Sequence, residues 1–215
     1  MKKKIDLSLY LVTDRELSAG RPLEDIVSAA VRGGVSVVQL REKDCSTIEY
    51  INLAWRIKDV LHNTKIPLII NDRLDVAQAV NADGVHVGQN DMPYHLARQI
   101  LGPNAIIGLT VESFEQAKEA ENLDADYLGV SAIFATPTKT DTVTEWGTSG
   151  LQSLRDMSKH KLVGIGGLNR SNTAEVLGSG ADGIAVVSAI CSAPDPEKAT
   201  RELRKIIDAN KLKKR

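Results

Sequence analysis

Short apolar runs recur along the whole chain, and each is followed by a longer stretch with helical periodicity. Most of the runs are continuously apolar, as in strands that are covered on both faces by helices. The runs predict eight strands, which are Leu9–Thr13, Val35–Leu40, Pro67–Asn71, Gly84–Gly88, Ala105–Leu109, Tyr127–Val130, Leu162–Ile165 and Gly183–Val187.

The helical stretches come between the predicted strands. We expect a helix to begin near Pro22, another to run from about Thr47 to His62, and the last to begin near Pro194. A strict order of strand then helix predicts parallel strands joined by crossovers. Eight such units favour an α/β fold, a single (β/α)8 TIM barrel. The alternative is an open doubly wound sheet, which would need fewer strands or a visible switch point.

This barrel is expected to be one domain over residues 1–215, with frayed basic ends at about 1–5 and 210–215. A weak internal repeat supports it, because Asn81–Val85 resembles Gly180–Ile184. Both segments precede an even-numbered strand, where a glycine is expected to adopt a left-handed conformation.

Composition and charge narrow the class of protein. With a formal net charge of −1, the protein lacks the broad positive field of a nucleic-acid binder. No apolar run reaches the roughly 20 residues of a membrane span. Cys45 and Cys191 stand in no metal or redox spacing and are expected to be free thiols in a reducing, cytoplasmic compartment. Small molecules are therefore the expected partners, without nucleic acid or membrane; whether the chain forms a homo-oligomer is left open.

The carboxyl ends of the strands carry the chemistry in such a barrel. The seventh strand leads into Gly164–Gly167, and a short helical turn is expected from Ser188 after the eighth. Backbone N–H groups at glycines and at a helix start suit a phosphate, so we expect a phosphate site here. The alternative is that the glycines only permit close packing.

A second anionic site is predicted after the second, third and fourth strands. Arg41 and Lys43 lie two apart on an extended segment, so both can face one ligand such as a diphosphate. Asp72 and Asp91 follow neighbouring strands and can share a Mg²⁺. Alternatively, Arg41 and Lys43 belong to a solvated charged loop, and either aspartate is a helix N-cap. The combination with Asn71 favours the metal–diphosphate site.

The loop after the sixth strand and one histidine complete the candidate chemistry. The loop after the sixth strand, which begins Thr136-Pro-Thr-Lys139, is expected to close over a ligand, unless it is only a surface loop. His86 lies in the middle of the fourth strand and is expected to be a core histidine instead of a catalyst.

Several motifs in order resemble the thiamine-phosphate synthase family. They are Tyr10-Leu-Val-Thr-Asp14, Gln39-Leu-Arg-Glu-Lys43, Asn71-Asp72, Asp83-Gly-Val-His-Val-Gly-Gln89 with Asp91, Thr136-Pro-Thr-Lys139, Gly164-Ile-Gly-Gly167 and Ser188-Ala-Ile190. The resemblance spans nearly the whole chain. It implies a transferase that joins 4-amino-2-methyl-5-hydroxymethylpyrimidine diphosphate to 4-methyl-5-(2-phosphoethyl)thiazole, plain or carboxylated, and releases diphosphate.

The resemblance also implies residue roles. The pyrimidine diphosphate would be held by Gln39, Leu40, Arg41, Glu42, Lys43, Asn71, Thr110 and Lys139, among which Arg41, Lys43, Thr110 and Lys139 would be catalytic. One Mg²⁺ per subunit would be held by Asp72 and Asp91. The thiazole phosphate would be held by Thr136, Pro137, Thr138, Gly167, Val187 and Ser188.

The sequence departs from the family pattern at two places. Thr110 stands where a serine is usual, and Ser131-Ala132 stands where Gly-Pro is frequent. Two alternatives stay open, a thiazole tautomerase on the same fold and a non-catalytic sensor of phosphorylated ligands. A tautomerase would not need the cations and carboxylates of the diphosphate site.

Overall fold

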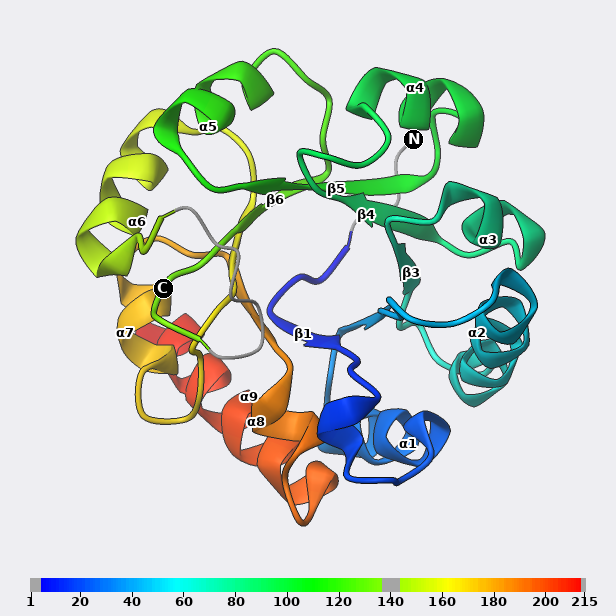
Figure 1. Ribbon diagram of the computed structural model, residues 1–215. Coiled ribbons are helices and arrows are strands. Elements are labelled where there is room, and N and C mark those ends of the chain that lie inside the picture. Colours follow the sequence, from blue (N-terminus) through cyan, green and yellow to red (C-terminus); the bar gives the residue numbers. More distant parts are fainter. Residues whose placement is uncertain (1–4, 137–143, 214–215) are drawn as a thin grey trace.

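The computed structural model describes residues 5–136 and 144–213. Eight parallel strands form a closed barrel in chain order, and β1 pairs with β8 to close it (Figure 1). The strands are β1 (Leu9–Val12), β2 (Val37–Leu40), β3 (Leu68–Asn71), β4 (Gly84–Val87), β5 (Ile106–Val111), β6 (Tyr127–Val130), β7 (Leu162–Gly164) and β8 (Gly183–Val186). The predicted (β/α)8 barrel is confirmed, and the open sheet is excluded.

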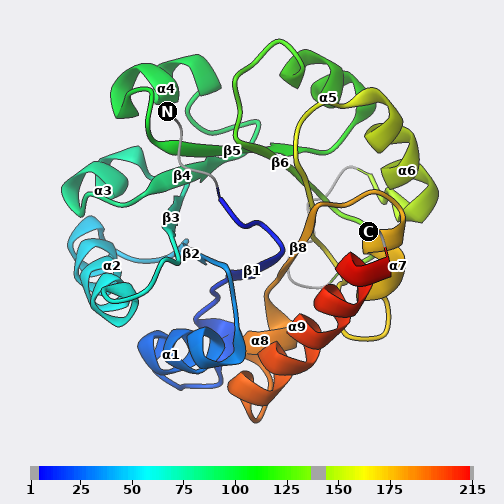
Figure 2. The ribbon, with the colours of Figure 1, turned by 180° about the vertical axis from the view of Figure 1, so that it is seen from behind.

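Helices surround the barrel as an outer ring. They are η1 (Glu16–Ser18), α1 (Leu23–Gly33), α2 (Thr47–Leu61), α3 (Leu74–Ala79), α4 (Tyr94–Leu101), α5 (Phe114–Ala120), α6 (Gly147–Met157), α7 (Thr173–Gly178), α8 (Ser188–Cys191) and α9 (Pro196–Lys213). The short helix expected from Ser188 is α8. The view from behind shows the segment before β1 crossing the opposite opening of the barrel (Figure 2).

Side chains alternate along each strand between the helix layer and the barrel interior. In β1, Leu9 and Leu11 belong to the large apolar cluster beneath the helices, whereas Tyr10 and Val12 belong to a smaller cluster inside the barrel. The interior cluster forms part of the wall of a pocket inside the barrel, because Tyr10, Tyr127 and Val163 belong to the cluster and also line that pocket.

The repeated segments before even-numbered strands have a definite role. The Oδ2 atom of Asp83 accepts a hydrogen bond from the N–H of Leu68 at 3.0 Å, and Oδ2 of Asp182 accepts one from Leu162 at 2.9 Å. Each aspartate thus ties an even-numbered strand to the start of its odd-numbered neighbour. Asp126 does the same for β5, because its Oδ2 accepts from the N–H of Ile107 at 2.8 Å.

The glycines that begin the even-numbered strands, Gly84 and Gly183, allow close approach of a neighbouring backbone and do not form a turn. A Cβ on Gly84 would lie 1.9 Å from the carbonyl oxygen of Ile106, and one on Gly183 would lie 1.8 Å from that of Leu7. The left-handed positions are Asn81 and Gly180 instead, with φ of 48° and 106°. A left-handed glycine is therefore found in only one of the two copies, at Gly180, three residues before β8 begins.

Among the described residues, no helix is long and apolar enough to cross a membrane.

Candidate active site

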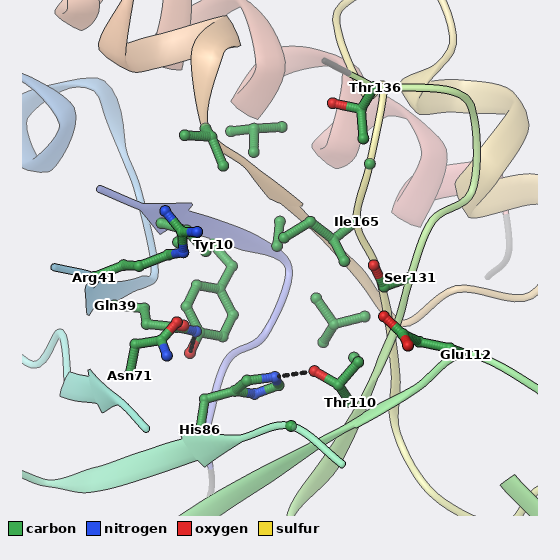
Figure 3. A pocket seen from close by; sticks show the side chains of 18 of the residues that line it. Tyr10, Gln39, Arg41, Asn71, His86, Thr110, Glu112, Ser131, Thr136 and Ile165 are labelled. Atoms are coloured by element: carbon green, nitrogen blue, oxygen red, sulfur yellow. Dashed lines mark hydrogen bonds between the residues drawn. The ribbon is translucent and has the colours of Figure 1, made fainter. Parts of the chain in front are cut away.

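A pocket of about 390 Å³ opens at the carboxyl ends of the strands. It is lined by eleven of the residues singled out in the sequence, namely Gln39, Arg41, Lys43, Asn71, Asp72, Asp91, Thr110, Thr136, Gly167, Val187 and Ser188. Pro137, Thr138 and Lys139 lie outside the described residues. Figure 3 shows Arg41, Gln39 and Asn71 on one side of the pocket and Thr110 and Glu112 on the other.

Two residues expected at the diphosphate lie elsewhere. The Leu40 side chain is completely buried in the cluster beneath the helices. The Glu42 carboxylate is almost completely buried and pairs with Arg15 at 2.9 Å. The alternation of an extended segment explains this, because Gln39, Arg41 and Lys43 face the pocket while the residues between them face away.

The two cations in the pocket are held by carboxylates. An Arg41 guanidinium nitrogen lies 3.3 Å from Oδ2 of Asp14, and Nζ of Lys43 lies 2.6 Å from Oδ2 of Asp72. Both cations remain partly exposed to the pocket, so they are available to an anionic ligand.

Asp72 and Asp91 are neighbours at the mouth of the pocket. The Asp72 backbone is left-handed, with φ of 59°, and Oδ2 of Asp91 accepts a hydrogen bond from the N–H of Gly88 at 2.7 Å. Burial raises the pKa of the Asp91 carboxyl, and the adjacent Asp72 carboxylate raises it further. Neither aspartate is a helix N-cap, because Arg73 precedes α3 and Pro93 precedes α4.

This pair suits a hard divalent cation. Two crowded carboxylates are stabilised by a shared cation, and Mg²⁺ takes few protein ligands and fills its remaining positions with water and phosphate oxygens. Within residues 5–136 and 144–213, no cluster of three or more His, Cys, Asp or Glu side chains is placed to hold a metal. Among the described residues, Asp72 and Asp91 are thus the carboxylates that would hold a metal at this end of the pocket, with water and ligand oxygens completing its coordination.

The glycine turn after β7 lines the far side of the pocket. Gly166 and Gly167 have φ of 97° and 65°, which other residues rarely adopt. A Cβ on Gly167 would lie 2.8 Å from the carbonyl oxygen of Ala135, so close packing also requires glycine there. Ser188 begins α8 beside this turn, and Val187 precedes it. Packing and anion binding are thus compatible uses of the same glycines.

Several lining residues were missed or misjudged in the sequence. His86 is half-buried and lines the pocket, where its Nε2 lies 2.8 Å from Oγ1 of Thr110. Tyr10, Tyr127 and the buried carboxylate Glu112 also line it. Val85 and Val87 face the helix layer, so strand alternation places His86 between them on the inner face, which is a usable signal in the sequence. Glu112 directly follows the fifth strand, which is another usable signal.

The fold and pocket together define a (β/α)8 barrel with a binding site for anionic small molecules at the carboxyl ends of its strands. The family described as "Thiamine monophosphate synthase" matches residues 9–190. A "Thiamine-phosphate synthase" of Albidiferax ferrireducens is 53% identical over 94% of this chain and 93% of its own. One of Syntrophomonas wolfei is 50% identical over 95% of this chain and 98% of its own.

A solved structure agrees with these relatives. "Thiamine phosphate pyrophosphorylase" of Pyrococcus furiosus superposes with a TM-score of 0.88 at 41% identity, covering 95% of this chain and 97% of that one. The chain belongs to the thiamine monophosphate synthase family. The family expected from the motifs is thereby confirmed.

Proposed function

We propose that the chain is the transferase that joins the aminopyrimidine diphosphate to the thiazole phosphate, giving thiamine phosphate and diphosphate. The observation that carries this proposal is the pocket itself. One cavity is lined on one side by Arg41, Lys43 and Asp72 and on the other by Gly167 and Ser188. Two phosphorylated ligands can therefore be held facing each other, as a condensation requires.

The first side is assigned to the pyrimidine diphosphate. Arg41 and Lys43 offer cationic donors to its phosphates, and Asn71 and Thr110 offer neutral polar groups in the same pocket. Gln39 lies deeper and is suited to the ring. Lys139, outside the described residues, is assigned to the diphosphate by the resemblance alone.

Asp72 and Asp91 are assigned to one Mg²⁺ per subunit. Their crowding, which raises the pKa of the Asp91 carboxyl, supports the assignment. When bound, Mg²⁺ supplies positive charge to a departing diphosphate. Without the metal, the Lys43 ammonium neutralises the Asp72 carboxylate, which it contacts at 2.6 Å.

The second side is assigned to the thiazole phosphate. Gly167 exposes backbone at a turn that lines the pocket, and Val187 and Ser188 lie beside it. Thr136 enters the pocket from the strand-six loop, whose next residues, Pro137 and Thr138, are assigned by the resemblance.

The chemistry breaks one bond and forms another. The C–O bond between the pyrimidine methylene and the diphosphate breaks, and both electrons leave with the diphosphate. Arg41 and Lys43 stabilise that charge. The electron-rich aminopyrimidine supports the methylene cation, and the lone pair of the thiazole nitrogen forms the new C–N bond. The pocket aligns the partners and limits access of water, which would capture the cation.

We further propose that the protein works in the cytoplasm as a single domain. Its two cysteines, Cys45 and Cys191, are free thiols, which supports a reducing compartment.

The test is a direct assay of the purified chain. Both substrates and Mg²⁺ are added, and diphosphate and thiamine phosphate are measured, with a parallel sample in which a chelator removes the metal. We expect equal amounts of both products and no reaction with chelator. Isomerisation of the thiazole phosphate alone would identify a tautomerase, and ligand binding without any product would identify a sensor.

A further inference from the structure

A series of hydrogen bonds crosses the barrel interior between residues that line the pocket. Nε2 of Gln39 donates to the Tyr10 hydroxyl at 2.9 Å, and the Tyr10 and Tyr127 hydroxyls are 2.7 Å apart. The Tyr127 hydroxyl is 3.0 Å from Nδ1 of His86, and Nε2 of His86 is 2.8 Å from Oγ1 of Thr110. The series thus links two residues assigned to the pyrimidine substrate, Gln39 and Thr110, through three that have no assigned role.

Two glycines leave the space that this series occupies. A Cβ on Gly108 would lie 2.1 Å from Cζ of Tyr127 and 2.5 Å from Nδ1 of His86. A Cβ on Gly129 would lie 2.9 Å from Cε1 of His86. The strands β5 and β6 therefore lack side chains where the His86 and Tyr127 rings pack together, with centroids 5.5 Å apart.

When Gln39 donates, one direction of the hydrogen bonds pairs every proton of the series. A Tyr10 hydroxyl that accepts from Gln39 keeps its own proton, and that proton is paired when Tyr10 donates to the Tyr127 hydroxyl 2.7 Å away. Tyr127 in turn donates to Nδ1 of His86, which requires the neutral ring with its proton on Nε2. His86 therefore donates to Oγ1 of Thr110.

The two ends of this hydrogen-bond series then offer opposite groups to a ligand, an acceptor at Gln39 and a donor at Thr110. The Gln39 amide has used its nitrogen, so its oxygen is the group left to accept a hydrogen bond. Thr110 accepts from His86, so its hydroxyl proton is left to donate. A 4-aminopyrimidine carries the complementary pair, an amino group that donates and a ring nitrogen that accepts.

We propose that Tyr10, Tyr127 and His86 are positioning residues that select an aminopyrimidine over the isosteric pyrimidinone by fixing Gln39 as acceptor and Thr110 as donor. This proposal rests on the proposed function. A pyrimidinone presents a carbonyl and a ring N–H in the same places, so it would meet each end of the series with the wrong polarity. Burial raises the pKa of both tyrosines, so their hydroxyls keep the protons that the series requires.

The first test reads the direction without any substrate. Nitrogen-15 NMR of the histidine rings distinguishes a protonated from a bare nitrogen, and a His86→Asn variant assigns the signal among the four histidines. We expect the proton of His86 on Nε2 and none on Nδ1. A proton on Nδ1 would mean that the series runs the other way and would overturn the proposal, whether or not the enzyme makes thiamine phosphate.

The second test measures selectivity. Binding of the aminopyrimidine diphosphate and of its 4-oxo analogue is compared by calorimetry. The wild type should prefer the amino compound by about a hundredfold, because a mismatched pair leaves buried polar groups unpaired. Tyr127→Phe should reduce that preference to a few-fold, with the KM for the thiazole phosphate unchanged.

Tyr94→Phe is the matched control, since it removes a buried hydroxyl that instead contacts Arg98 on α4. It should keep the full preference. An unchanged preference in Tyr127→Phe, or an equal loss in Tyr94→Phe, would contradict a positioning role. A preserved preference pattern without any condensation activity would overturn only the proposed function.

Discussion

At the residue scale, Arg41 separates a catalytic role from a structural one. Its guanidinium is partly exposed and pairs with Asp14 at 3.3 Å, and such pairs contribute at most about 1 kcal/mol to stability. Arg41→Ala should therefore fold normally. It should lower kcat by about a hundredfold or more, because a cationic donor to the leaving diphosphate is lost. Steady-state kinetics and thermal melting measure the two effects.

Arg170→Ala is the control for Arg41. Arg170 also pairs with a carboxylate, Glu202, at 2.7 Å, but it lies on the surface after the strand-seven turn. Arg170→Ala should have the same melting temperature as Arg41→Ala but keep the wild-type kcat. Near-wild-type turnover in Arg41→Ala would remove Arg41 from the diphosphate site.

Single residues also show where sequence reasoning was sufficient. Arg41 and Asp72 were predicted because they directly follow apolar strands, and Asp91 because it lies in the loop after the next strand; strand ends converge in a barrel. Tyr10 and Tyr127 were not found, because an aromatic residue inside an apolar run has the same pattern whether it packs or bonds. Their hydroxyls meet at 2.7 Å although the two residues are 117 positions apart.

At the scale of elements, β5 and β6 must leave room for the rings between them. Gly108→Ala would place a Cβ 2.1 Å from Tyr127 in a closed barrel, and such overpacking costs about 1–3 kcal/mol. We expect a lower unfolding midpoint in urea together with weaker binding of the pyrimidine diphosphate, since the hydrogen-bond series shifts.

Gly178→Ala provides the comparison for Gly108. Gly178 is the last residue of α7, and a Cβ at this position would have no other atom within 4 Å. The substitution should be neutral or slightly stabilising, because alanine favours a helix over glycine by up to about 1 kcal/mol. If both variants lost equal stability, the space argument for Gly108 would be wrong.

The boundaries of elements were predicted less well than their order. The strand β5 continues through Val111, past the polar Thr110 that ended the apparent apolar run. The last helix, expected near Pro194, begins at Pro196, because the Asp195 carboxylate caps it by accepting from the N–H of Lys198 at 2.9 Å. Hydrophobic period locates an element, whereas local side-chain bonds fix its ends.

At the scale of the whole molecule, the stability of the fold should fall as the pH is lowered. Glu121, at the end of α5, accepts from the Ser158 hydroxyl at 2.5 Å and from the N–H of Lys159 at 3.2 Å, which ties this helix to the segment before β7. Burial opposes ionisation of Glu121, but these hydrogen bonds and the nearby His160 and Lys159 outweigh it and lower its pKa below the ordinary 4.5.

A carboxyl with a lowered pKa in the folded state stabilises the fold above its ordinary pKa. That contribution disappears as the pH falls from about 5 through the folded pKa, because the unfolded chain takes up the proton first. The urea midpoint should therefore decline between pH 5 and pH 3. Glu121→Gln should lose about 1 kcal/mol at pH 7, since a charge-assisted hydrogen bond is replaced by a neutral one, and should show a shallower decline.

The exposed Glu119 lies on the same helix and supplies the matched substitution. Glu119→Gln removes the same charge without removing the contacts to Ser158 and Lys159, so it should follow the wild-type acid profile. An identical profile for all three proteins would mean that this link between α5 and β7 opens before the barrel does. The acid dependence would then have to come from carboxylates such as Asp6, whose pKa is also lowered because hydrogen bonds from Ser8 outweigh burial. A shallower profile in Glu121→Gln alone would place the acid-sensitive contact between these two elements.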